Sequence, residues 1–140
     1  MGLFKDEQDV YQVLGTFFRQ FSTNQDFGPD IHNSRLIIQF EYTDPAAVIT
    51  IDTVNVAEPE YYKVYEGEVE MKPDVHMKMK ADIANKFWLG KLNLLSALSR
   101  RQIIAKGPIP KILKLLPAIK PAYAMYQDYL KEIGRTDLLG

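Results

Sequence analysis

The chain has 140 residues, of which 46% are apolar and 25% charged, and its formal net charge is −1. This length and composition fit one folded domain with a real core and exclude a disordered chain. The absence of cysteine excludes disulfides, thiolate metal sites and cysteine nucleophiles. The start of the chain turns acidic where a signal peptide would turn apolar, and no run of 18 apolar residues occurs, so we expect a soluble, cytoplasmic protein.

The first third of the chain predicts one helix, a loop and the start of a sheet. Apolar residues recur at helical spacing from Val10 to Phe21, which indicates an amphipathic helix over about residues 5–21. Its Phe residues lie on one face, and we interpret them as core. Residues 22–33 contain Gly28-Pro29-Asp30 and are expected to form a loop. Alternating apolar and polar residues then predict strands over 36–43, 47–52, 61–69 and 75–82.

Beyond residue 82 the periodicity becomes helical. Two short helices are expected over about 83–89 and 92–98, followed by a short strand over 102–107. Residues 109–133 predict helix again, but three prolines cannot all sit inside one straight helix, so we expect a break near Pro117. This order of elements indicates an α+β fold, with residues 1–140 forming a single domain.

Candidate catalytic residues are few. His32 beside the loop and His76 on the polar face of a strand are typical of solvated side chains. Glu66, Glu68 and Glu70 alternate along the third strand and indicate a solvated face, because a Ca²⁺ or Mg²⁺ site needs more oxygen ligands. We therefore expect no catalytic residue, no metal site and no cofactor, and predict that the chain is not an enzyme.

Charge is divided unevenly along the chain. Residues 1–77 hold 5 Lys and Arg against 14 Asp and Glu, whereas residues 78–140 hold 12 against 4. Either acidic and basic elements neighbour each other in the fold, or the basic half contacts anionic lipid headgroups, a phosphate-bearing ligand or, transiently, an anionic membrane surface. The basic residues are dispersed and no nucleic-acid-binding motif accompanies them, so nucleic acid is not an expected partner.

The last third carries more apolar residues than one helix stripe requires. In the segment from Ile112 to Ile119 they nearly encircle the helix. Such a helix is buried on every side, faces a partner or lines an apolar cavity, and the sequence leaves these alternatives open.

Residues 75–116 resemble the sterol carrier protein type 2 family of nonspecific lipid-transfer proteins. The resemblance rests on the alternating strand Val75–Lys80, a short helix ending in Leu89-Gly90-Lys91-Leu92, a second short helix, a brief strand leading to Gly107 and a closing apolar helix. The order of elements agrees over residues 5–134. The resemblance implies a five-stranded, mainly antiparallel sheet covered by helices, with an apolar tunnel for fatty acids, fatty acyl-CoA, phospholipids or sterols.

The resemblance also implies the residues of the site. The tunnel wall would comprise Met77, Met79, Phe87, Trp88, Leu92, Leu95, Leu98, Ile104, Ile109, Ile112, Leu113, Leu116 and Ile119. Candidates for a headgroup or phosphate at the mouth are Lys91, Arg100, Arg101 and Lys106. This interpretation makes the protein a non-catalytic carrier of hydrophobic ligands.

The alternative is a protein-interaction or accessory module. In that case the apolar closing helix and the tyrosine-rich tail, with Tyr123, Tyr126 and Tyr129, would contact a partner subunit or a second copy in a homodimer.

Overall fold

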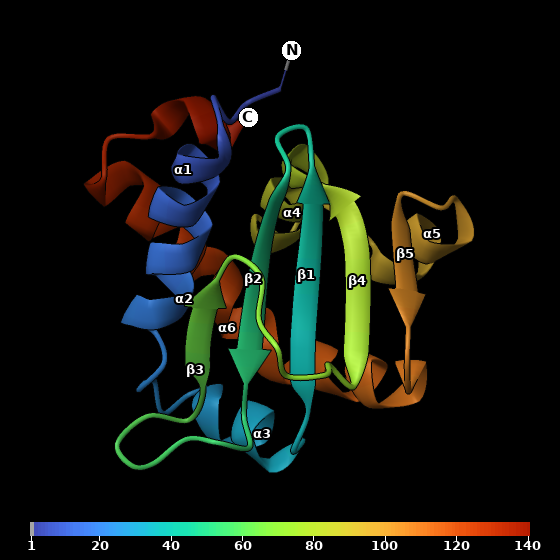
Figure 1. Cartoon of the computed structure of the whole chain (residues 1–140). Coiled ribbons are helices and arrows are strands. Elements are labelled where there is room, and N and C mark those ends of the chain that lie inside the picture. Colours follow the sequence, from blue (N-terminus) through green and yellow to red (C-terminus); the bar gives the residue numbers. More distant parts are fainter. Residues whose placement is uncertain (1) are drawn as a thin grey trace.

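The computed structural model describes residues 2–140, which are built around one five-stranded sheet (Figure 1). The strand order is β3-β2-β1-β4-β5. The central strands β1 and β4 are parallel, and the other three pairs are antiparallel. The predicted five-stranded, mainly antiparallel sheet is therefore confirmed. The strands are β1 (Ile37–Thr43), β2 (Ala47–Asp52), β3 (Lys63–Glu66), β4 (Val75–Lys80) and β5 (Ile103–Lys106).

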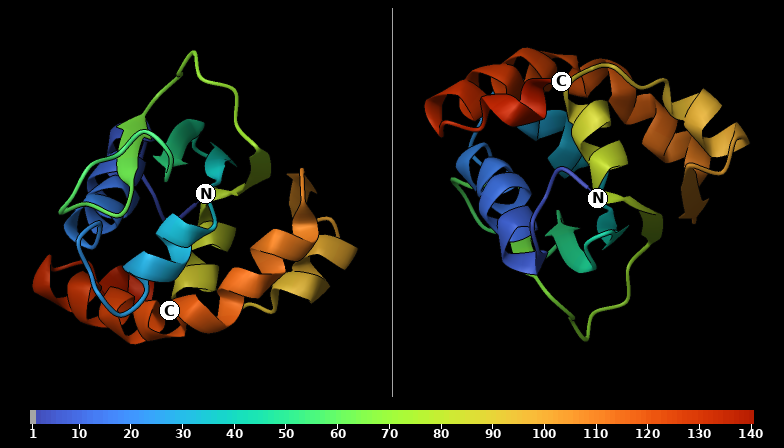
Figure 2. Two further views of the ribbon diagram at one scale, coloured as in Figure 1. Left: turned by 90° about the horizontal axis from the view of Figure 1, so that it is seen from below. Right: turned by 90° about the horizontal axis from the view of Figure 1, so that it is seen from above.

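The helices gather on one face and one edge of this sheet (Figures 1 and 2). α6 runs behind the sheet, and α4 contacts both β4 and α6. The expected first helix is present but contains a π-helical turn over Tyr11–Gly15 between α1 and α2. The helices are α1 (Glu7–Val10), α2 (Thr16–Gln20), α3 (Gly28–Asn33), α4 (Ala81–Trp88), α5 (Leu94–Ser99) and α6 (Ile109–Glu132), followed by a 3-10 turn over Thr136–Leu139.

The predicted alternation fixes which side of the sheet packs against the helices. Ile38, Tyr42 and Met77 are buried, whereas Gln39 and Glu41 on the alternate positions of β1 are polar and partly exposed. On that polar face Nε2 of His76 lies 3.0 Å from a carboxylate oxygen of Glu41. One face of the central strands therefore supplies apolar side chains toward the helices, as expected for a sheet with one solvated side.

Two elements differ from the sequence expectation in the first half. The segment expected to be a loop contains α3, because Pro29 sits in the first turn, where its missing N–H costs nothing. β3 is shorter than expected and ends at Glu66, followed by Gly67 with a positive φ of 88°. Glu68 consequently lies beyond the strand, and the three glutamates do not share a strand face.

The expected break near Pro117 is absent, since α6 is a single helix from Ile109 to Glu132. Pro117 and Pro121 are both exposed and lie four residues apart, on the outward side of the helix. The backbone carbonyls that lose a partner to each proline face the same side, where water can hydrogen-bond them. Figure 2 shows α6 as one curved ribbon.

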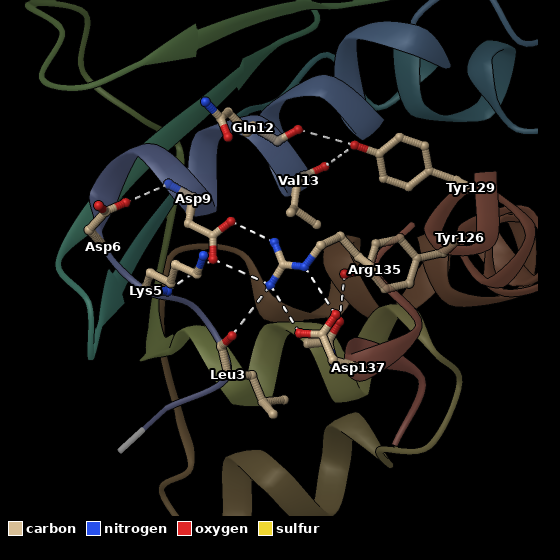
Figure 3. A network of polar contacts seen from close by, with 11 residues as sticks. Leu3, Lys5, Asp6, Asp9, Gln12, Val13, Tyr126, Tyr129, Arg135 and Asp137 are labelled. Carbon is tan, nitrogen blue, oxygen red and sulfur yellow. Dashed lines mark hydrogen bonds and ion pairs between the residues drawn. The ribbon is translucent and has the colours of Figure 1, made fainter. Parts of the chain in front are cut away.

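A network of polar contacts joins the two ends of the chain (Figure 3). Nη1 of Arg135 donates to a carboxylate oxygen of the largely buried Asp9 at 2.6 Å, and Nε of Arg135 donates to Asp137 at 3.1 Å. The hydrogen bond to Asp137, together with the contact to Asp9, raises the pKa of Arg135 above its ordinary value. The C-terminal segment is thereby held against the first helix.

Candidate functional site: an apolar cavity between sheet and helices

A cavity of about 110 Å³ lies between the helix-facing side of the sheet and the helices that cover it. Its wall draws on four strands and all helices except α1: Phe17, Phe18, Phe21, Phe27, Ile31, Ile38, Phe40, Tyr42, Ile51, Tyr62, Met77, Met79, Ala84, Phe87, Trp88, Leu94, Ile103, Ile112, Leu115, Leu116, Ile119 and Ala122. Apolar cavities of about 150 Å³ in proteins accept a molecule the size of benzene. A long aliphatic chain therefore requires the wall to move.

Aromatic rings form part of this wall. The ring centroid of Phe18 in α2 lies 5.3 Å from that of Trp88 in α4 and 5.9 Å from that of Phe40 in β1. Phe17 packs edge-on against Trp88 at 5.8 Å. Pairs at these distances are favourable contacts that hold rings in place. The rest of the wall contains Met77 and aliphatic side chains, which adapt more easily to an occupant.

The residues of this wall carry few polar side-chain groups. They are the hydroxyls of Tyr42 and Tyr62 and the indole N–H of Trp88. The Tyr62 hydroxyl donates to the backbone carbonyl of Phe18 at 2.6 Å. The Tyr42 hydroxyl is buried and has no hydrogen-bond partner. Burial raises the pKa of both hydroxyls above the ordinary value, so both stay protonated at neutral pH.

The structure brings seven of the predicted wall residues into the cavity wall: Met77, Met79, Phe87, Trp88, Ile112, Leu116 and Ile119. Six others lie outside it. Leu95 and Ile104 point to solvent with exposed fractions of 60% and 45%. The residues that line the cavity are Leu94 and Ile103, which lie one position earlier in the same elements. The other four, Leu92, Leu98, Ile109 and Leu113, are half-buried without reaching the cavity.

The predicted headgroup residues do not form one cluster. All four are exposed. Arg100 and Arg101 precede β5 and Lys106 ends it, so they lie at opposite ends of that strand. The ammonium group of Lys91 donates to the backbone carbonyl of Leu139 at 2.8 Å.

Several residues of the cavity wall were not predicted from the sequence, because the sequence pattern indicated only that they pack in the core. Phe17, Phe18 and Phe21 pack in the core and also line the cavity. Phe40 pairs with Met77 in register across β1 and β4, as Tyr42 does with Met79. Both strands alternate apolar and polar residues, and this common pattern in the sequence could have indicated that β1 contributes to the same wall as β4.

Other chemistry is sparse among residues 2–140. No group of three His, Asp or Glu side chains in this range could hold a metal ion. Nδ1 of His32 lies 3.0 Å from the carbonyl oxygen of Tyr61, and His76 contacts Glu41 on the polar face of the sheet. Within the same range no helix is both long and apolar enough to cross a membrane.

Comparison with known proteins identifies the architecture. No family model matches the sequence, and no curated protein matches it either. Among solved structures, sterol carrier protein domain 2 of Helicoverpa armigera is 19% identical, with 82% of this chain and 88% of that chain covered and a TM-score of 0.64. A structure of sterol carrier protein 2 is 14% identical, with 83% and 94% covered and a TM-score of 0.60. Sterol carrier protein 2 from Yarrowia lipolytica is 17% identical, with 93% and 96% covered and a TM-score of 0.57.

These identities are low, so the agreement concerns the fold. It extends over most of this chain and most of each of those chains. The resemblance inferred from residues 75–116 is confirmed at that level: this chain has the α+β fold of sterol carrier protein 2.

Proposed function

We propose that this protein binds and carries hydrophobic ligands in the cavity between sheet and helices and has no catalytic activity of its own. The observation that carries the proposal is the composition of the wall, which is apolar or aromatic throughout and contributes only three polar side-chain groups. Such a wall favours an aliphatic chain or ring system over water. The ligand classes that fit are a fatty acid, a fatty acyl-CoA, a phospholipid or a sterol.

The energetics favour a carrier of moderate affinity. Burying about ten methylene groups at about 0.8 kcal/mol each supplies roughly 8 kcal/mol before ordering costs. Because the cavity measures only about 110 Å³, part of this free energy is spent on displacing side chains of the wall. Met77 and Met79 can move at little cost, since thioether chains have several rotatable bonds. Micromolar binding, weak enough for release, is the expected result.

Trp88 offers a direct test, because it is the only tryptophan of the chain and it lines the cavity. Protein stripped of lipid by organic extraction is titrated with oleate, with 1-decanol and with a lysophospholipid, and the tryptophan emission is recorded. We expect a saturable change with at least one of them, and a matching one-to-one adduct in native mass spectrometry. Unchanged emission and an apo mass with all three would refute the carrier function.

A second candidate is a protein-interaction or accessory module, which exposed apolar residues favour. Leu95 in α5 and Ile104 in β5 are exposed on two elements that contact each other. The tyrosine-rich tail does not supply this surface, because Tyr126 and Tyr129 are buried in the core. Light scattering during dilution tests the homodimer version, and a mass that stays that of one chain at every concentration excludes it. If a dimer is found, an unchanged mass distribution in the variant Leu95→Glu excludes the surface around Leu95 as its interface.

A further inference from the structure

The stretch between Asp82 and Asp128 carries only positive charges. Residues 83–127 contain no Asp or Glu but eight Lys and Arg residues. All eight are exposed, and within residues 2–140 none of them forms an ion pair with a carboxylate. No contact inside the described fold therefore neutralises this positive surface. Its residues are Lys86, Lys91, Arg100, Arg101, Lys106, Lys111, Lys114 and Lys120.

Five of the eight lie along one edge of the molecule. Figures 1 and 2 show α5, β5 and the first turns of α6 together at the edge of the sheet beyond β4. We call the five residues of these elements the basic edge. Arg100 and Arg101 join α5 to β5, Lys106 ends β5, and Lys111 and Lys114 lie in the first turns of α6.

The distribution of charge fits an extended anionic partner. The basic edge is spread along the whole length of β5, so one phosphate group cannot contact all of it. Most Asp and Glu residues belong to residues 1–77, whose α1 and β3 lie at the opposite edge (Figure 1). An extended negative surface attracts the basic edge and repels the acidic one, and it thereby orients the molecule.

Two exposed apolar side chains accompany the basic edge. Leu95 in α5 is 60% exposed and Ile104 in β5 is 45% exposed, and the two elements contact each other. Apolar side chains among Lys and Arg are typical of surfaces that bind in the interface of a lipid bilayer, where the apolar groups enter the acyl boundary and the cations contact headgroups. A nucleic acid would meet the charges but would leave both apolar side chains in water. A bilayer satisfies both features.

The elements of the basic edge are also elements of the cavity wall. Leu94, Ile103 and Ile112 line the cavity from α5, β5 and α6. The side chains that follow the first two in the chain, Leu95 and Ile104, are exposed. The cavity and the basic edge therefore lie on two sides of the same elements. A ligand that leaves between these elements enters the phase that the basic edge contacts.

Resting on the proposed carrier function, we propose that the basic edge, together with Leu95 and Ile104, docks the protein on an anionic lipid bilayer, and that ligand is exchanged with the bilayer between α5, β5 and the start of α6. The Lys and Arg side chains contact the headgroup phosphates. Each of them strengthens binding about fivefold when it lies close to the membrane surface, and salt weakens this contribution.

Co-sedimentation with lipid vesicles tests the docking. The vesicles consist of phosphatidylcholine alone or of phosphatidylcholine with phosphatidylglycerol, each in low and in high salt. We expect the wild type to bind only the vesicles with phosphatidylglycerol, and more weakly in high salt. Lys111→Gln combined with Lys114→Gln should weaken this binding about twentyfold. A wild type that binds neither kind of vesicle would overturn the docking surface.

Lys63→Gln combined with Lys131→Gln is the matched control. It removes the same charge from two exposed residues, one in β3 at the other edge of the sheet and one near the far end of α6. We expect vesicle binding to stay within about threefold of the wild type, because distant charges are screened. Equal losses in the two double variants would show that net charge, and not the basic edge, determines the binding.

A fluorophore at Leu95 distinguishes a bilayer from other polyanions. Since the chain has no cysteine, Leu95→Cys and Ile133→Cys each accept one environment-sensitive label. Ile133 is 42% exposed and directly follows α6, so it is an apolar position away from the basic edge. We expect the emission of the label at Leu95→Cys to shift to the blue with phosphatidylglycerol vesicles but not with polyglutamate or a DNA duplex. The label at Ile133→Cys should shift with none of them. No shift at Leu95→Cys, or binding of polyglutamate as tight as that of vesicles, would overturn the bilayer as the partner.

Titration with monomeric 1-decanol, followed by Trp88 emission, keeps the docking surface and the carrier function apart. The variant with Lys111→Gln and Lys114→Gln should bind 1-decanol as the wild type does, because neither lysine lines the cavity. Binding of 1-decanol without docking on vesicles would refute the docking surface and leave the carrier function standing. Docking on vesicles without uptake of oleate, 1-decanol or lysophospholipid would remove the carrier function and the ligand exchange, and would leave the docking surface.

Discussion

The hydroxyl of Tyr129 in α6 donates a hydrogen bond to the backbone carbonyl of Val13, 2.6 Å away and 116 residues earlier in the chain. The carbonyl of Gln12 lies 3.2 Å from the same hydroxyl (Figure 3). Both carbonyls belong to the π-helical turn Tyr11–Gly15, which departs from the regular i to i−4 bonding of an α-helix. The tyrosine thus adds a side-chain hydrogen bond to the carbonyl of Val13, which also accepts from the backbone N–H of Thr16, and it ties the first helical segment to α6.

Replacing Tyr129 with phenylalanine should lower the free energy of unfolding by about 1 kcal/mol, because the buried hydrogen bond from its hydroxyl to the carbonyl of Val13 is lost. Urea unfolding followed by circular dichroism measures the change. Tyr123→Phe is the control, since Tyr123 is half-buried and packs edge-on against Phe87. Equal losses in the two variants would contradict the role assigned to this hydrogen bond.

Alkaline pH should destabilise the fold through its buried tyrosines. Burial raises the pKa of Tyr129 from 10.0 to about 12, and it raises the pKa values of Tyr42, Tyr62 and Tyr126 as well. Because the folded-state pKa exceeds the unfolded one, this stabilisation is complete below pH 10 and is lost as the pH rises toward 12.

Urea unfolding at a series of pH values, with phenolate absorbance recorded alongside, tests this. We expect the free energy of unfolding to fall above pH 10, with part of the phenolate signal appearing only as the protein unfolds. Complete ionisation of all eight tyrosines in the still-folded protein would show that the buried hydroxyls are not shielded.

The ion pair between Asp9 and Arg135 should contribute more to stability than the neighbouring pair with Asp137. Asp9 has a side-chain exposure of 10%, whereas that of Asp137 is 56%. Arg135→Gln leaves the Asp9 carboxylate without its charged partner and should cost about 2 kcal/mol. Asp137→Asn removes an exposed partner and should cost under about 1 kcal/mol. The melting temperatures of the two variants measure both losses. A larger decrease for Asp137→Asn than for Arg135→Gln would show that the exposure of the carboxylate does not determine how much each ion pair stabilises the fold.

Sequence patterns predicted the fold better than the site, because strands and helices depend on local periodicity whereas the site depends on contacts between distant segments. The alternation of Val75, Met77 and Met79 identified β4 and its buried face, since a period of two is a property of the strand itself. The π-helical turn and α3 have no comparable period. α6 continues past Pro117 because the proline happens to lie on the outward side, which only the packed structure shows.

The cavity wall depends on contacts between distant segments. Met77 was assigned from its strand, but Phe40 joins it only because β1 and β4 are adjacent and in register. Ile104 was placed on the wall although the neighbouring residue Ile103 occupies it, because a four-residue strand carries too short a pattern to fix its inward face. The unpartnered hydroxyl of Tyr42 has no signature in the sequence, since it depends on how distant segments pack around the side chain.

Two leucines one turn apart on α6 separate cavity binding from general packing. Leu116 lines the cavity and Leu113 does not, although both are half-buried in the same helix. Leu116→Glu places a carboxylate against the apolar wall, where an aliphatic ligand cannot solvate it, so we expect ligand affinity to fall at least tenfold. The resemblance implied that Leu113 lies in the tunnel wall, but its position outside the cavity predicts that Leu113→Glu keeps an affinity within about threefold of the wild type.

Titration of each variant with 1-decanol, followed by Trp88 emission, measures this difference, and melting temperatures establish that both variants are folded. If Leu113→Glu loses binding while Leu116→Glu keeps it, the ligand occupies a different part of the helical layer from the cavity. If both variants bind as the wild type does, α6 does not form the wall of the binding site, and the carrier function would have to be carried by another surface.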